Sequence, residues 1–192
     1  MASKPILFST PMVQAILEGR KTVTRRVIKP QPTGYFEVND SPCYLYDFSD
    51  REGRVYPRYQ VGDILYVREA YADLLFHYVY KADYRGQDLT LEELDLLSDV
   101  KWKPSIHMPK EIARIFLKVT NVRVERLRDI TETQVRKEGF RDYLAADDTF
   151  YPSGYYFRQT WDGTIKKQDL DKYSWEANPW VWVIEFERTE KP

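Results

Sequence analysis

The sequence predicts a mixed α+β fold built on a small β-barrel. Short segments of alternating apolar and polar residues outnumber the helical segments, and they do not follow a regular β–α–β order. Hydrophobic residues make up 43% of the chain, which is enough for a core. Neither an internal repeat nor a domain linker divides the 192 residues, so we expect a single domain over 1–192.

The first elements are marked by their own start and stop signals. A short apolar strand is expected over 5–9, followed by a helix with Thr10 as its N-cap and Pro11 at its first position. Gly19 ends this helix, since glycine adopts the left-handed conformation of a helix end without strain. A strand with a period of two then covers 21–28.

Alternation and turn residues predict the remaining strands. Residues 33–60 are interpreted as an insertion, because turn residues alternate there with short aromatic strands. Further strands are expected over 64–69, 77–81, 114–127 and 180–187. The acidic stretch between the second and third of these strands contains an expected short helix at 91–97.

Two later helices are also predicted. Thr131 with Gln134 forms the pattern of a capping box, so a helix begins here, and Gly139 ends it. A second helix is expected over 155–161.

The overall charge gives no general attraction for nucleic acid or anionic membranes, because the net charge is −1. A local basic patch does stand out in the first thirty residues, where six cations oppose one acid. These cations are Lys4, Arg20, Lys21, Arg25, Arg26 and Lys29. Aromatic residues make up 15% of the chain, which suits either flat ligands or a β-rich core.

Cysteine and histidine are scarce, and this limits the disulfides and metal sites that the chain can form. Cys43 is the single cysteine, which excludes an internal disulfide and indicates a reducing, cytoplasmic location. With His77 and His107 it cannot complete a structural zinc site, so we expect no metal and no other cofactor. We expect neither a signal peptide nor a membrane span at the N-terminus, because it lacks a long apolar run. The glycine-rich motifs of common nucleotide-binding folds are also missing from the sequence.

The most informative segment is GRKTVTRR, residues 19–26. A lysine amine beside a threonine hydroxyl is a possible base and nucleophile, and the same groups can grip a phosphate. Lys21 and Thr24 would face opposite sides of an ideal strand, so a bend after Gly19 is needed to bring them together. A solvated basic strand that discourages aggregation is the simpler alternative.

The order of several motifs resembles the ASCH domain of the PUA-like superfamily. A helix that ends in GRKT is followed by a VGD turn, a long valine-rich strand, a capped helix ending in Glu-Gly and a final WVIEF strand. The blocks KPILFSTPMVQAILEGRKTVTRRVIKPQP, WKPSIHMP and NPWVWVIEF are similar to the phage- and prophage-associated branch of that family. The resemblance covers nearly the whole chain, apart from 33–60 and 140–176, which we interpret as insertions.

The resemblance implies a PUA-like small β-barrel with flanking short helices and a cleft near the first helix. PUA-like domains bind RNA or modified bases, and a small ASCH member is an amidohydrolase that removes acetyl from N4-acetylcytidine. Its implicated residues correspond here to Lys21, Thr24 and Glu138. The expected ligand is therefore a modified pyrimidine nucleoside or base. Binding or cleavage of RNA in the same basic cleft stays open, and the sequence does not indicate an oligomeric state.

Chemical roles follow from this correspondence. The like charges of neighbouring arginines disfavour the ammonium form of Lys21, which helps it act as a base toward Thr24. Glu138 would orient Lys21 and return the proton to the leaving amine, with Glu69 as the rival carboxylate. Further candidates for holding the substrate are Arg25, Arg26, Trp102 and His107, together with Trp180 and Trp182 as stacking surfaces.

Overall fold

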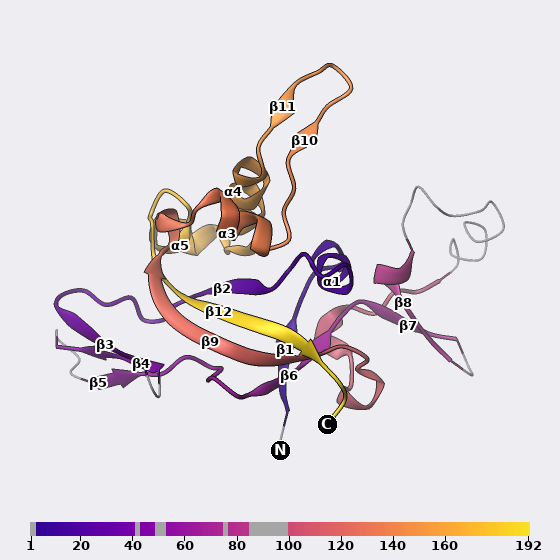
Figure 1. Ribbon diagram of the computed structural model, residues 1–192, viewed down its shortest axis with the longest axis horizontal. Helices are drawn as coiled ribbons and strands as arrows, with labels where there is room; N and C mark the ends of the chain where they lie inside the picture. Colours follow the sequence, from indigo (N-terminus) through magenta and orange to yellow (C-terminus); the bar gives the residue numbers. More distant parts are fainter. Residues whose placement is uncertain (1–2, 41–42, 49–52, 75–76, 85–99) are drawn as a thin grey trace. The chain divides into compact units, whose positions relative to one another are not determined.

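The computed structural model describes residues 3–40, 43–48, 53–74, 77–84 and 100–192. Within these residues the chain forms several β-sheets and four short α-helices, which confirms the α+β class (Figure 1). No sheet of the described part closes into a barrel. The helix expected at 91–97 lies outside the described residues.

The chain folds as two compact units, each assembled from separate segments. Unit 1 consists of Met1–Gly19, Ile64–Leu117 and Arg188–Pro192. Unit 2 consists of Arg20–Asp63 and Lys118–Glu187.

Unit 1 contains two pairs of strands. β1 (Lys4–Leu7) pairs in parallel with β6 (Ile64–Arg68), and β7 (Tyr71–Asp73) pairs antiparallel with β8 (Tyr78–Tyr80). Met108 and Phe116 pack with Tyr71 in a small buried cluster. The predicted strands over 5–9, 64–69 and 77–81 are therefore confirmed, with ends shifted by one or two residues.

The helix of unit 1, α1 (Thr10–Leu17), begins one residue earlier than predicted. Ser9 is the N-cap, because it keeps an extended conformation while its carbonyl oxygen accepts the first helical hydrogen bond from Val13 N at 2.9 Å. The prediction of Thr10 as the N-cap is wrong, because Ser9 and Thr10 are both favoured N-cap residues and the sequence does not decide between neighbours. Gly19 does end the helix, with φ of +74°.

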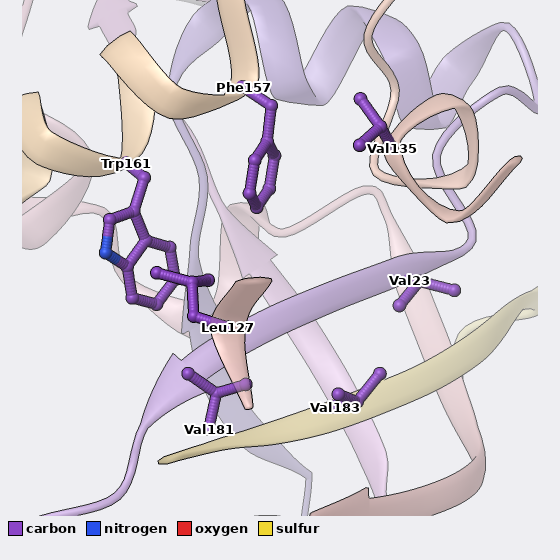
Figure 2. Close-up of a cluster of buried hydrophobic side chains, with 7 residues drawn as sticks. All are labelled: Val23, Leu127, Val135, Phe157, Trp161, Val181 and Val183. Atoms are coloured by element: carbon purple, nitrogen blue, oxygen red, sulfur yellow. The ribbon is translucent and has the colours of Figure 1, made fainter. Parts of the chain in front are cut away.

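Three neighbouring strands form the framework of unit 2. β12 (Trp180–Thr189) lies between β9 (Phe116–Arg126) and β2 (Val23–Val27), and it pairs antiparallel with β2 so that Ile184 is opposite Thr24. One face of this sheet carries a core that also includes residues from the helices, as Figure 2 shows. Its members are Val23, Leu127, Val135, Phe157, Trp161, Val181 and Val183.

The helices over this core place Glu138. α3 (Glu132–Lys137) packs against α4 (Ser153–Thr164), and α5 (Leu170–Tyr173) follows. Val135 on α3 faces the core, so the C-terminal end of α3 lies close to the start of β2 (Figure 2). Gly139, at φ +99°, turns the chain directly after Glu138.

Both proposed insertions carry their own small sheets within unit 2. In the first, β3 (Phe36–Asp40), β4 (Cys43–Asp47) and β5 (Gly53–Val55) form an antiparallel sheet. In the second, β10 (Tyr143–Leu144) and β11 (Phe150–Tyr151) form a hairpin that extends from the helices (Figure 1). Cys43 is buried and free, and burial raises the pKa of its thiol to about 11.

The capping box of α3 gives a test of local stability. Thr131 Oγ1 accepts a hydrogen bond from Gln134 N, while Gln134 Oε1 accepts one from Thr131 N at 2.8 Å. Thr131→Ala is expected to lower the free energy of unfolding by about 1 kcal/mol in a urea titration, because an N–H of the first turn loses its acceptor. The exposed Thr160→Ala on α4 is the matched control and should cause no such loss, since alanine favours a helix interior.

Candidate functional site

The site begins where the chain enters β2. Lys21 forms an isolated antiparallel bridge with Glu138, and Thr22 N donates a hydrogen bond to Lys137 O at 2.8 Å. This pairing joins two segments more than a hundred residues apart. It places the Lys21 amine 2.7 Å from Glu138 Oε2, and both residues are less than 5% exposed.

The Lys21 amine is surrounded by oxygen acceptors. Besides Glu138 Oε2, it donates to Val23 O at 2.8 Å and to Glu138 O at 2.9 Å. Burial nevertheless lowers the pKa of Lys21, and the nearby charges of Arg26 and Arg25 lower it further, while Glu138 opposes the change. Like charge was the predicted cause of a lowered pKa, but burial is the larger one.

Glu138 is also held by a row of charged side chains. Its Oε1 accepts from Arg25 Nη1 at 3.1 Å, and Arg25 Nη2 reaches Glu125 Oε2 at 2.9 Å. Arg123 then bridges Glu125, at 2.6 Å, and Glu185. Arg25 is therefore a buried member of the site that fixes Glu138, rather than a group open to substrate as the sequence had suggested.

Thr24 and Arg26 lie together on the neighbouring stretch of β2. Arg26 Nη1 donates to Thr24 Oγ1 at 2.7 Å, as residues two apart on one face of a strand can do. Within the described part of the chain, no hydrogen bond joins Lys21 to Thr24. The bond from Arg26 occupies a lone pair of the hydroxyl and leaves its hydrogen to be donated elsewhere. We call Lys21, Thr24, Arg25, Arg26 and Glu138 the Lys21 centre.

Glu69, the rival carboxylate, belongs to unit 1 and has a different partner. Arg114 binds it through two nitrogen atoms at 2.9 and 3.0 Å, and also contacts Asp83 at 2.8 Å. The Arg114 guanidinium lies 4.0 Å from the centre of the Tyr80 ring. Burial raises the pKa of Glu69, against the effect of Arg114. The two hydrogen bonds from Arg114 explain how the Glu69 carboxylate can be buried, so Glu69 has a structural role in unit 1.

The predicted stacking residues are distributed over both units. In unit 1, Trp102 is half-buried with its ring centre 5.9 Å from that of Tyr84, and His107 is exposed. In unit 2, Trp182 is buried, and Trp180 packs edge-on against Phe36 with ring centres 4.8 Å apart. Trp180 and Trp182 are thus both engaged in packing.

A basic pocket opens in unit 2, beside the residues that lead into the Lys21 centre. It has a volume of about 530 Å³ and contains four cations and one carboxylate. It is lined by Arg20, Thr133, Arg136, Lys137, Phe140, Arg141 and Asp142. Sequence reasoning found Arg20 but missed the other cations, because they follow Thr131 in a helix and turn that were considered only for Glu138.

Two other features are absent from the described part of the chain, namely a metal-ligand cluster and a membrane-spanning helix. No group of three or more His, Cys, Asp and Glu side chains gathers there in a way that would hold a metal ion. No helix among the described residues is both long and apolar enough to cross a membrane.

No protein-family model, curated protein or solved structure matches this chain. The chemistry of the Lys21 centre and of the basic pocket is therefore the basis for a functional assignment.

Proposed function

We propose that this protein is a metal-independent amidohydrolase that removes the acyl group from N4-acylated cytidine or cytosine. The observation that carries the proposal is the buried contact of 2.7 Å between the Lys21 amine and Glu138. Burial lowers the pKa of Lys21, as a lysine that acts as a base requires. The choice of substrate rests on the resemblance to the ASCH domain.

The reaction proceeds in two balanced steps. Thr24 Oγ1 attacks the acyl carbon, and its proton passes to the neutral amine of Lys21. The C–N bond breaks, N4 of cytidine takes the proton from Lys21, and the acyl group remains as an ester on Thr24. Water then attacks this ester, Lys21 again accepts a proton, and the carboxylic acid leaves as the threonine hydroxyl is restored.

The remaining residues of the Lys21 centre have supporting roles. Arg26 already donates to Thr24 Oγ1, so it is well placed to stabilise the negative charge that develops on the acyl oxygen. Arg25 binds the other carboxylate oxygen of Glu138, which fixes the carboxylate that orients the amine. A rotation of the Thr24 hydroxyl toward Lys21 on substrate binding completes the arrangement.

Three finer expectations belong to the same proposal. The PUA-like barrel would provide the cleft for the pyrimidine, and a cytoplasmic location would give access to nucleosides or RNA. Glu138, rather than Glu69, is the carboxylate we assign to catalysis, since it contacts the Lys21 amine directly.

The pH dependence of hydrolysis provides the first test. With N4-acetylcytidine as substrate and absorbance as the readout, kcat/KM is expected to rise with pH and to level off below 10.5, the ordinary pKa of a lysine amine. The rise occurs because only the neutral amine accepts a proton, and a lowered pKa makes this form available at lower pH.

The same assay contains its own control. EDTA should leave the rate unchanged, since the two steps use side chains and water alone. A rate that EDTA abolishes and a divalent cation restores would contradict the lysine-base mechanism, and an absence of cytidine release at every pH would refute the proposed activity.

A further inference from the structure

We infer that Glu125 is a positioning residue of the Lys21 centre, because it holds the Arg25 guanidinium in place and so sets how strongly Glu138 binds the Lys21 amine. Glu125 acts through Arg25 and Glu138 rather than on the substrate. Its role in hydrolysis rests on the proposed function, whereas its effect on the amine is a property of the folded protein and can be measured without any reaction.

Acids and bases alternate along a row that leads from the Lys21 amine toward solvent. We call this set the charged row, and its members after Lys21 are Glu138, Arg25, Glu125, Arg123 and Glu185. The exposed fraction of the side chain rises from 2% at Lys21 to 19% at Glu125 and 35% at Glu185. Charges that are partly buried are screened much less than charges at the surface, so the charge of Glu125 is felt within the Lys21 centre.

Arg25 divides its guanidinium between two carboxylates. Nη1 donates to Glu138 Oε1 at 3.1 Å, and Nη2 donates to Glu125 Oε2 at 2.9 Å. Because the guanidinium is planar and rigid, two carboxylates fix its orientation more firmly than one. Glu125 is itself held by Arg123 Nε at 2.6 Å and by Gln134 Nε2 at 3.4 Å. Glu125 therefore joins β9 to β2 and to α3, the helix that ends at Glu138.

A purely structural ion network is the simpler explanation, but the surroundings of Arg25 favour a functional one. Arg25 lies two residues after Val23 on β2 and opposite Val183 on β12, and both valines belong to the core of unit 2. Replacing buried ion pairs by apolar residues of similar size is often neutral or stabilising, because no charge then has to lose its water. The effect on the Lys21 amine thus explains charges beside an apolar core better than stability does.

Charged and titratable groups approach the Lys21 amine from several elements. Burial is the main cause of the lowered pKa of Lys21, Arg26 and Arg25 of β2 lower it further, and Glu138 at the end of α3 opposes them. Tyr59, from the segment before β6, is a titratable group close to Arg26. The balance between Arg25 and Glu138 is the part of this environment that Glu125 controls.

The order of charges along the row fixes the sign of each substitution. Glu125 compensates part of the positive charge of Arg25, so Lys21 experiences more of that charge when Glu125 is neutral. The pKa of Lys21 then falls further, because a nearby like charge disfavours the ammonium form. Arg123 in turn compensates Glu125, so the loss of Arg123 should have the opposite effect and raise the pKa of Lys21. A contribution to folding alone does not predict opposite signs.

NMR titration of the Lys21 amine in the full chain tests these signs. Glu125→Gln is expected to lower the midpoint by roughly half a pH unit, less than the ~1 to 3 units that a charge in direct contact causes. Arg123→Gln is expected to raise the midpoint by a smaller amount, since Arg123 is one position further along the row. Glu125→Asp keeps the negative charge and should restore a midpoint close to that of the parent.

Two matched controls neutralise one exposed ion pair. Glu176→Gln and Arg158→Gln remove an acid and a base whose side chains are 64% and 50% exposed, and neither should move the midpoint of Lys21. Far-UV circular dichroism checks that each variant is folded. If Glu125→Gln does not fold, Arg123→Gln decides the question, because Arg123 is 28% exposed and its substitution disturbs less of the interior.

The titration and the hydrolysis assay separate this inference from the proposed function. In active variants, the rise of kcat/KM for N4-acetylcytidine should move with the Lys21 midpoint. Opposite shifts in Glu125→Gln and Arg123→Gln would establish the role of Glu125 even in a protein that hydrolyses nothing. Midpoints that stay unchanged, or that move in the same direction in both variants, would overturn the inference, and hydrolysis by the parent would still support the amidohydrolase.

Discussion

Lys21→Arg is expected to lower kcat for N4-acetylcytidine hydrolysis by about 10²- to 10⁴-fold, the usual contribution of a general base. Arginine retains the positive charge and can still bind Glu138, but its guanidinium does not lose a proton in a protein. The substitution therefore removes the base while it keeps the ion pair. Initial rates at saturating substrate, measured at the plateau of the pH profile, are the readout.

Two further variants make this result specific. Lys118→Arg is the same substitution at an exposed position of β9, and its rate should equal that of the parent. Thr24→Ala should also lose most of the activity, and Lys21→Arg combined with Thr24→Ala should lose little more, because a base and its nucleophile act as one unit. A Lys21→Arg protein with near-parental kcat would show that Lys21 is not the base.

Glu138→Gln is expected to lower the free energy of unfolding by about 3 to 5 kcal/mol, as found when one partner of a buried ion pair is removed. Lys21 and Arg25 are each 3% exposed, and both are paired with Glu138, while Arg25 has Glu125 as a second negative partner. A neutral amide of similar shape leaves these cations buried with less compensation. Urea unfolding followed by tryptophan fluorescence gives the measurement.

The control for Glu138 is Glu176→Gln. Glu176 is paired with Arg158 and Arg128, but its side chain is 64% exposed, so its loss should change the free energy of unfolding by less than about 1 kcal/mol. Replacing Lys21, Arg25 and Glu138 together by apolar residues of similar size should recover part of the loss from Glu138→Gln, because no uncompensated charge then remains buried. An unfolding midpoint of Glu138→Gln equal to that of the parent would contradict this account of the ion pair.

Local signals explain which parts of the fold could be predicted. The capping box at Thr131 and the helix end at Gly19 depend on neighbouring residues, so the sequence alone locates them. The alternation in β12 and β2 likewise reveals the strands, but it does not reveal that they pair, because the register joins residues about 160 positions apart. The expected barrel depended on such long-range pairing, and alternation carries no information about closure.

The candidate site likewise has residues that the local sequence reveals and contacts that only the folded chain reveals. Lys21 and Thr24 stand out in one basic strand, whereas the choice of Glu138 came from the resemblance to a family rather than from spacing. Glu125 was not found as a partner of Arg25, although Arg123 and Glu125 are spaced so that they share one face of β9. The contact between Lys21 and Glu138, which are 117 residues apart, exists only after the chain has folded.

The titration of the Lys21 amine tests the central claim most directly, because the mechanism requires that this buried amine lose its proton more readily than an ordinary lysine. Its side-chain NMR resonance can be assigned by comparison with Lys21→Arg and followed as the pH is raised. The account predicts a midpoint below 10.5 that coincides with the rise of kcat/KM for N4-acetylcytidine. A midpoint at or above 10.5 would mean that the ion pair with Glu138 outweighs burial, and Lys21 would then be a structural cation and not the base.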